Sequence, residues 1–338
     1  MARVRLRAAL ALIAGMIWAS GTVAQTVSVG HLGIVADAPF YIGIEKGYFA
    51  KAGLTLSLER FASAAQATLP LSTDKVQVAG GGLSAALFNA FARGLPIRIA
   101  MARTRDTDGF SSDTLSLRED LAGTVTTLAA LKGRKIAVNA PAGALEYMLG
   151  KMLESAGLEF RDADVTYMSW PDMGTAFSNK GIDLGTVVEP FTTQYAERKL
   201  AVPFRNAAQV LKNPPLEVSV ILYSKTWIDR SPGEVRGFTK AYLEAVRDYY
   251  DAMRGGPKRG EVVDILAKYT ALKDKPLYDR ITWSYMDPNA EISIASLKDQ
   301  QDWYAKRGAV ERKVDVEAML DLRFRDEALK ELGRVTEK

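Results

Sequence analysis

In the first part of the chain, segments with the apolar period of a β-strand alternate with segments that have the apolar period of an α-helix. Apolar side chains alternate with polar ones over residues 26–30 and 54–58, which predicts two half-buried strands. Between them, residues 38–54 predict one continuous helix, with Pro39 in its first turn and Gly53 at its end. The start of this helix carries free backbone N–H groups and therefore favours anions.

The alternation of strand and helix continues in the next part of the chain. We expect Gly80 to Gly82 to form a tight turn that leaves Ser84 as the N-cap of a helix. Because strands and helices alternate, they predict a largely parallel sheet with helices on its faces. The elements predicted here are helices over 64–71 and 84–93 and strands over 75–79 and 97–102.

The pattern stops over residues 104–127 and starts again at Arg134. The sequence E-S-A-G-L at 154–158 repeats A-K-A-G-L at 50–54, which indicates a second lobe on the plan of the first, although any two such units share this much. The strands expected in this lobe are 135–138, 164–167 and 182–187, and the helices are 143–156 and 171–179. We assign residues 25–115 and 222–338 to lobe 1 and residues 116–221 to lobe 2.

An apolar strand over residues 216–223 is expected to lead the chain back to the first lobe, and the rest is mainly helical. Ser231, Pro232 and Glu234 have the pattern of a capping box at a helix start. Helices are predicted from there to about Met253 and over 261–269, 294–307 and 326–335, with a weaker signal over 278–286.

Composition adds an expectation about the start of the chain. Three arginines, an apolar run over residues 8–18 and Thr22-Val23-Ala24 together resemble a signal peptide cleaved near Ala24. A membrane anchor is the alternative, but the run is shorter than the roughly 20 residues that a spanning helix needs. These arginines supply most of the net charge of +4, so the charge gives no argument for binding nucleic acid.

Few residues could carry catalysis or hold a metal. The chain has no cysteine, and His31 is its only histidine. It contains no G-x-S-x-G, no P-loop, no G-x-G-x-x-G after a strand and no H-E-x-x-H or EF-hand spacing. We therefore expect a binding protein without a cofactor or metal, with its ligand in a crevice at the carboxyl ends of the strands.

Four motifs together resemble the nitrate/sulfonate/taurine group of ABC-transporter substrate-binding proteins, which is NMT1/THI5-like. They are P-F-Y-I-G-I-E-K-G-Y-F-A-K-A-G-L at 39–54, G-G-G-L-S-A-A-L-F-N-A-F-A-R-G-L-P at 80–96, L-K-G-R-K-I-A-V at 131–138 and V-V-E-P-F at 187–191. The resemblance implies a type II periplasmic-binding-protein fold: two α/β lobes, each a mainly parallel sheet flanked by helices, with extra C-terminal helices. It also implies delivery of the ligand to a membrane permease driven by a separate ATPase.

Carried over position by position, the resemblance implies a ligand site between the lobes. The residues expected in it are Gly33, Asp37, Ala38, Phe40, Gly81, Gly82, Ser84, Arg103, Thr104, Ala142, Gly143, Trp170 and Glu189.

Several of these residues have two explanations. Two opposed helix N-termini, at Ser84 and at Gly143, would form a clamp for an anion, but each could be a plain turn and cap. Arg103 could bind an acid group or be solvated, and Trp170 could line the cleft or pack in a core. Glu189 could accept a hydrogen bond from a ligand amine or favour its own helix start.

The leading hypothesis is a periplasmic, monomeric solute-binding protein of an ABC importer that captures a small organic anion: a sulfonate, a taurine-like compound or an aromatic carboxylate. Asp37 would repel a bare anion, so we expect the ligand to have an apolar body or a donor as well. The alternatives are a thiamine-pyrimidine-type heteroaromatic stacked on Trp170, an exported enzyme using His31 and Asp37, and a sensory subunit.

Overall fold

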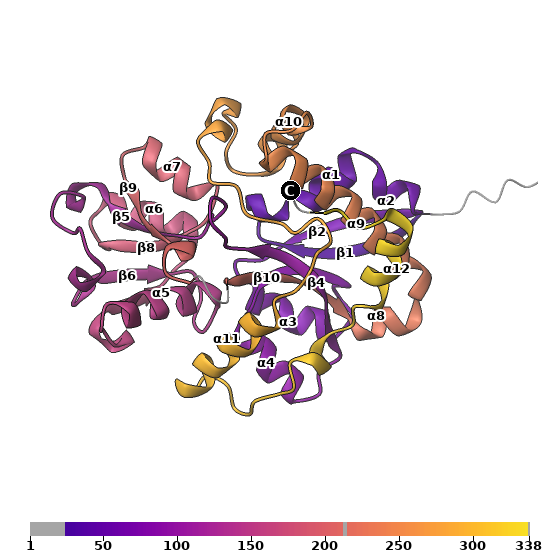
Figure 1. Ribbon diagram of the computed structural model, residues 1–338, viewed down its shortest axis with the longest axis horizontal. Coiled ribbons are helices and arrows are strands. Elements are labelled where there is room, and N and C mark those ends of the chain that lie inside the picture. Colours follow the sequence, from indigo (N-terminus) through magenta and orange to yellow (C-terminus); the bar gives the residue numbers. More distant parts are fainter. Residues whose placement is uncertain (1–23, 212–214, 337–338) are drawn as a thin grey trace, which may run out of the picture.

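The computed structural model describes residues 24–211 and 215–336. The expected signal peptide lies outside these residues, except for Ala24. Two five-stranded sheets form two lobes that lie side by side (Figure 1). In spatial order, the first sheet contains β2 (Leu54–Arg60), β1 (Gln25–His31), β3 (Val78–Gly82), β10 (Glu217–Ser224) and β4 (Ile97–Arg105). The second contains β7 (Asp164–Tyr167), β6 (Lys135–Val138), β8 (Leu184–Val187), β5 (Thr114–Arg118) and β9 (Ala201–Asn206).

Each sheet has one strand that runs against the other four, and in each it is the strand that arrives from the other lobe. β10 is antiparallel to β3 and β4, and β5 is antiparallel to β8 and β9. The chain crosses between the sheets over residues 106–113 and 207–216. Residues 114–115 therefore pair in the second sheet and residues 217–221 in the first, a few residues away from the boundaries that we predicted.

The predicted α/β class with mainly parallel sheets is confirmed, but two local predictions are wrong. Residues 38–54 form two helices, α1 (Ala38–Glu45) and α2 (Tyr48–Lys51), because Gly47 between them has a φ of 69° that interrupts the helix. Gly80 to Gly82 are the end of β3 and pair with β10. Glycine is required at position 80 because a Cβ there would lie 2.9 Å from Nε of Arg103.

Helices cover both faces of each sheet (Figure 1). In the first lobe these include α3 (Ala64–Ser72) and α4 (Ala85–Ala92), and in the second α5 (Ala144–Ser155), α6 (Trp170–Ser178) and α7 (Phe191–Glu197). The C-terminal part adds α8 (Lys225–Arg230), α9 (Pro232–Met253), α10 (Arg259–Tyr269), α11 (Ile294–Lys306) and α12 (Arg323–Leu332). The weak signal over residues 278–286 does not correspond to an α-helix. The capping box does not form, because Glu234 accepts a hydrogen bond from Trp227 instead.

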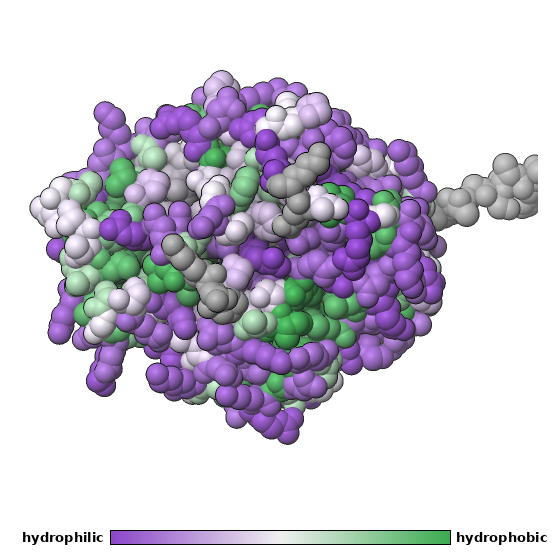
Figure 2. Space-filling model, in the orientation of Figure 1, coloured by the Kyte–Doolittle hydropathy of each residue, from purple (hydrophilic) through white to green (hydrophobic). Residues whose placement is uncertain are grey.

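Aromatic rings join the C-terminal helices to the first lobe. Phe238 of α9 lies 5.0 Å from Phe49 of α2 and 6.5 Å from Phe40 of α1, measured between ring centroids. Phe40 is fully buried here, so it belongs to this core rather than to the ligand site where we had placed it. Hydrophilic residues dominate the face in Figure 2, with smaller hydrophobic patches between them. Among the described helices, none is both long and apolar enough to cross a membrane.

The helix α11 contacts the second lobe although it belongs to the C-terminal part. Trp303 of α11 packs edge-on against Tyr147 of α5, and its Nε1 donates a hydrogen bond of 2.9 Å to Glu154 Oε1. The guanidinium of Arg307, at the end of α11, lies 3.9 Å from the ring centroid of Phe160 in the second lobe. The lobes are therefore connected here as well as through the two crossing segments.

We expect Trp303→Ala to lower the free energy of unfolding by about 3 kcal/mol, because it removes a buried indole and leaves a cavity between α11 and α5. The matched control is Leu69→Ala, since Leu69 of α3 is 68% exposed and its loss should cost less than about 0.5 kcal/mol. Urea unfolding of both variants measures the difference. Equal effects would show that α11 adds nothing to the packing of the second lobe.

Candidate functional site

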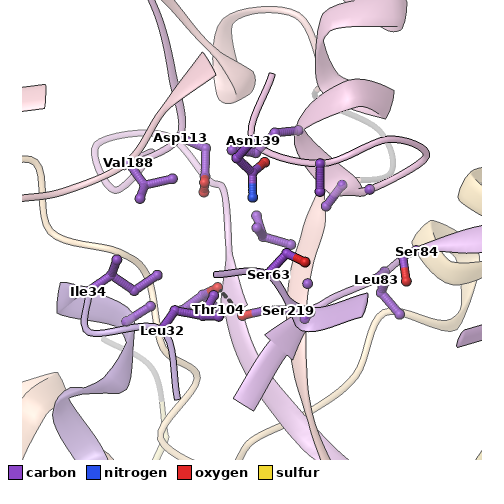
Figure 3. Close-up of a pocket in the computed structure, with 18 of the residues that line it drawn as sticks. Leu32, Ile34, Ser63, Leu83, Ser84, Thr104, Asp113, Asn139, Val188 and Ser219 are labelled. Atoms are coloured by element: carbon purple, nitrogen blue, oxygen red, sulfur yellow. Dashed lines mark hydrogen bonds between the residues drawn. The ribbon is translucent and has the colours of Figure 1, made fainter. Parts of the chain in front are cut away.

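A cleft lies between the two lobes, at the carboxyl ends of the parallel strands. It encloses ≈ 690 Å³, including the space that opens to solvent at its mouth. Figure 3 shows Asp113, Asn139 and Val188 on the side of the second lobe, opposite Thr104 and Ser219 of the first. The lining residues come from loops and helix starts of both lobes, so the site exists only when the lobes are together.

The lobes are closed on each other through backbone hydrogen bonds at two places. The N–H of Ala85 donates to the carbonyl of Ala142 at 2.9 Å, and Ser84 and Gly143 face each other as an antiparallel bridge. Elsewhere along the contact, the N–H of Val35 donates to the carbonyl of Glu189 at 3.2 Å. These bonds cross from one lobe to the other, so they must break when the cleft opens.

Three helices begin at the cleft. The residues before them are Ser63 for α3, Ser84 for α4 and Gly143 for α5, and all three line the cleft. The predicted clamp of two facing helix starts is partly closed on itself, because the first N–H of α4 already donates to Ala142. The N–H of Ala142 in turn donates to Glu146 Oε2 at 2.9 Å. The start of α3, which we did not predict as part of the site, adds a further set of N–H groups.

Asp37 does not face the cleft. Its carboxylate is fully buried and accepts hydrogen bonds from the N–H groups of Leu32, Gly33 and Ile34 at 2.8–3.0 Å. Its other oxygen is paired with Nη2 of Arg103. The expectation that Asp37 would repel an anion is therefore wrong, because its charge is compensated inside the first lobe.

Arg103 lies at the cleft wall with most of its donors in use. Nε donates to the carbonyl of Ala36 at 3.1 Å, and Nη2 is paired with Asp37. No hydrogen bond of Nη1 is found among the described residues. Among the described residues that line the cleft, Arg103 is the one with a positive charge.

Trp170 and Glu189 line the cleft and are also packed into the second lobe. Nε1 of Trp170 donates to the carbonyl of Thr186 at 3.2 Å, and its ring stacks on Phe191. The Glu189 carboxylate accepts hydrogen bonds from the N–H of Thr193 at 3.1 Å and from the N–H of Thr282, in the C-terminal part, at 3.2 Å. Burial raises the pKa of Glu189 to about 7, against the lowering effect of these donors.

Comparison with known proteins places the chain in a family. The family model described as NMT1-like matches residues 21–260. The chain belongs to the NMT1-like family. No curated protein matches it by sequence.

Solved structures show which folds this NMT1-like chain resembles. The alkanesulfonate-binding protein SsuA from Xanthomonas axonopodis pv. citri, bound to MOPS, has a TM-score of 0.71 at 17% identity over 88% of this chain and 98% of its own. The periplasmic nitrate-binding protein NrtA from Synechocystis PCC 6803 has a TM-score of 0.73 at 17% identity, over 91% and 89%. The desulfurization enzyme DSZB has a TM-score of 0.65 at 16% identity, over 91% and 99%. At these identities the likeness establishes the fold alone.

The structure divides the predicted site of this NMT1-like protein into two sets. The residues that line the cleft are Gly82, Ser84, Arg103, Thr104, Gly143, Trp170 and Glu189. The remaining predicted residues, Gly33, Asp37, Ala38, Phe40, Gly81 and Ala142, are not part of this lining and lie directly behind it or beside it in the chain. Residues of the second set lie in or behind the backbone segments that carry the first set.

Six polar residues of the cleft were missed. Ser63 precedes α3, Ser219 lies within β10 and Asn139 follows β6. Ser112 and Asp113 precede β5, and Ser284 lies in the C-terminal part. The hydroxyls of Ser219 and Thr104 are 2.5 Å apart. Asn139 directly after a strand was a usable signal, whereas the sequence gives no sign that β10 and residue 113 meet at the cleft.

His31 does not line the cleft of the NMT1-like chain. Its Nδ1 lies 2.9 Å from the Tyr41 hydroxyl oxygen and 3.9 Å from Asp37 Oδ2, and burial lowers its pKa. His31 and Asp37, the two groups of the enzyme hypothesis, are thus close to each other. Both are bound to other protein groups behind the cleft wall.

We expect Asp37→Ala to lower the free energy of unfolding by about 3 kcal/mol, because it leaves the guanidinium of Arg103 buried without its partner. Asp108→Ala is the matched control, since Asp108 is exposed and its loss should change stability by less than about 0.5 kcal/mol. Urea unfolding monitored by circular dichroism measures both. A small effect of Asp37→Ala would contradict the structural role given to the ion pair.

The pKa of Glu189 makes stability depend on pH. With a pKa near 7 in the folded state and about 4.5 when unfolded, Glu189 holds a proton between these values only in the folded protein. The free energy of unfolding should therefore fall as the pH rises from about 5 to 7, with a slope of up to about 1.4 kcal/mol per pH unit for one proton.

Unfolding of Glu189→Gln in urea across this pH range should show a smaller slope than the wild type. Glu119→Gln, at an exposed position, should keep the wild-type slope. Identical slopes in all three proteins would assign the pH dependence to other groups.

Proposed function

We propose that this protein is the periplasmic solute-binding component of an ABC importer and that it captures a small organic anion between its lobes. The ligand would be a sulfonate, a taurine-like compound or an aromatic carboxylate. The observation that carries the proposal is the cleft itself, which both lobes line and which backbone hydrogen bonds between Ala85 and Ala142 hold shut. A capture protein needs this property, because the same movement that encloses a solute can release it.

The chemistry of the cleft supports an acid group on the ligand. The starts of α3, α4 and α5 direct partial positive charge into the cleft, and Arg103 in the lining adds a guanidinium whose charge is partly compensated by Asp37. Apolar side chains of Leu32, Ile34 and Val188 and the edge of Trp170 provide contacts for a hydrocarbon body. This combination suits a small organic acid better than a bare inorganic ion.

The partners follow from the proposed role. After capture, the closed protein would dock on a membrane permease that a separate ATPase drives, and it would act as a monomer. Residues 1–24 would direct export and then be removed. Fold relatives described as binding proteins for alkanesulfonates and nitrate support this assignment, and the presence of an enzyme with the same fold is the reason to test it directly.

A disulfide across the cleft tests capture by closure. The chain has no cysteine, and Ser84 and Gly143 face each other as an antiparallel bridge pair, for which Cα separations of about 4.5 to 5.5 Å allow a disulfide. We expect the oxidised Ser84→Cys/Gly143→Cys protein to retain the small molecule with which it is purified through extended dialysis. The same protein after reduction should lose the molecule faster.

Native mass spectrometry before and after dialysis measures the bound molecule, and each single cysteine variant is the control.

In the wild type, a ligand at a hundred times its dissociation constant should add about 2.7 kcal/mol to stability in a thermal-shift screen of sulfonates and carboxylates. Loss of ligand at the same rate from the oxidised and reduced double variant would contradict capture by closure. A protein that carries no small molecule and is stabilised by no acid in the screen would contradict the proposed function.

A further inference from the structure

Asp113 places a carboxylate in the cleft, at the point where the chain enters the second lobe. The residue is 4% exposed and belongs to the cleft lining. Its side chain points into the space between the lobes, next to Asn139 and opposite Thr104 and Ser219 (Figure 3). A buried carboxylate that points into a ligand cleft needs a partner there, because desolvating a charge without hydrogen bonds is costly.

A second carboxyl group lies behind Asp113. Asp106, in the same crossing segment, is 1% exposed, and among the described residues its two carboxyl oxygens have no hydrogen-bond partner. Burial raises the pKa of Asp106 well above its ordinary value, and the nearby charge of Asp113 raises it further. Burial raises the pKa of Asp113 less, to about 6, so Asp106 keeps its proton at neutral pH and Asp113 is the ionised member of the pair.

The remaining hydrogen-bonding capacity of Asp113 faces the ligand. Within its own segment, the side chains of Asp106 and Ser112 lie near the carboxylate, and the Ser112 hydroxyl is 2.7 Å from that of Ser284. A carboxylate can accept about four hydrogen bonds, so acceptor positions remain toward the cleft. The neighbouring amide of Asn139 can both donate and accept.

The charges around the cleft leave Asp113 without an ionic partner of its own. Burial raises the pKa of Asp113, the charge of Arg103 opposes this rise, and Nη2 of Arg103 is committed to Asp37. Glu189, the other acid in the lining, is held near neutrality by burial and accepts bonds from Thr193 and Thr282. A ligand with only an acid group would leave the negative charge of Asp113 uncompensated.

We propose that Asp113 selects ligands that carry an N–H-bearing nitrogen, such as an ammonium group, in addition to their acid group. The acid group lies toward the helix starts and Arg103, and the nitrogen donates to the Asp113 carboxylate beside Asn139. Asp106 holds the proton of the pair, which leaves Asp113 ionised. The inference rests on the proposed function, since it assumes that this cleft is where the solute binds.

Matched pairs of small acids that differ only in an amino group test the inference. The probes are taurine with ethanesulfonate, β-alanine with propionate and 4-aminobenzoate with benzoate, each titrated into the wild-type protein by calorimetry at pH 7.5. We expect the amino member of at least one pair to bind about tenfold or more tightly than its partner, which is typical of a hydrogen bond to a charged group.

Three aspartates of one segment provide the variants. Asp113→Asn should abolish the preference for the amino member, and its melting temperature without ligand should be equal to the wild type or higher, because a buried charge is removed. Asp106→Asn should keep the preference, because asparagine imitates the protonated, uncharged form of Asp106. Asp108→Asn is the control, since Asp108 is exposed in the same segment.

The outcomes separate this inference from the proposed function. Equal binding of both members of the pairs that bind would overturn the role of Asp113 and leave capture of an organic anion intact. No binding by any of the six compounds would overturn both. An amino preference that survives Asp113→Asn, or a lower melting temperature of that variant with the preference unchanged, would make Asp113 a structural residue only.

Discussion

The ion pair between Asp37 and Arg103 is the interaction on which the first wall of the cleft depends. The chain must turn sharply after β1, and the turn buries three N–H groups that need an acceptor. The Asp37 carboxylate meets that need, and its charge then requires Arg103 from the end of β4. Because Gly80 leaves room for the guanidinium, the ends of β1, β3 and β4 and the start of α1 are fixed by one pair of side chains. The cleft thus has a stiff wall built from neutralised groups.

Each sheet contains one strand that follows a crossing from the other lobe, and buried acids lie near these two crossings. Each crossing leads to a strand at an inner position of the opposite sheet, and acids next to these strands are buried, although Asp108 on the first crossing is exposed. Asp106 and Asp113 lie on the first crossing, and Glu217 begins the strand that follows the second. Burial raises the pKa of Glu217 to about 7, although Arg105 lies beside it. These buried acids are stable only when each is protonated or accepts hydrogen bonds. Their protonation is therefore coupled to the ligand between the lobes.

The fold is compatible with both binding and catalysis, and the groups that line the cleft favour binding. Binding proteins and a desulfurization enzyme share this two-lobed architecture, so the arrangement of sheets cannot decide between capture and catalysis. In this chain the one histidine lies behind the wall of the cleft, where Tyr41 and the Asp37 ion pair occupy its surroundings. The groups that do face the cleft are hydroxyls, an amide, helix starts and partly compensated charges, which are suited to holding a polar solute.

The sequence by itself determined the order of strands and helices, the division into two α/β lobes and seven of the residues that line the cleft. These features depend on local signals, which are the apolar period, the helix caps at Ser84 and Gly143, and the four short motifs quoted above. The tertiary structure alone decided that Asp37 is neutralised by Arg103, that Gly80 to Gly82 extend a strand, and that Asp113 and Ser219 meet at the cleft. Each of these depends on contacts between segments far apart in the chain, because the crossing strands bring them together, and no period or motif within one segment records which partner it will meet.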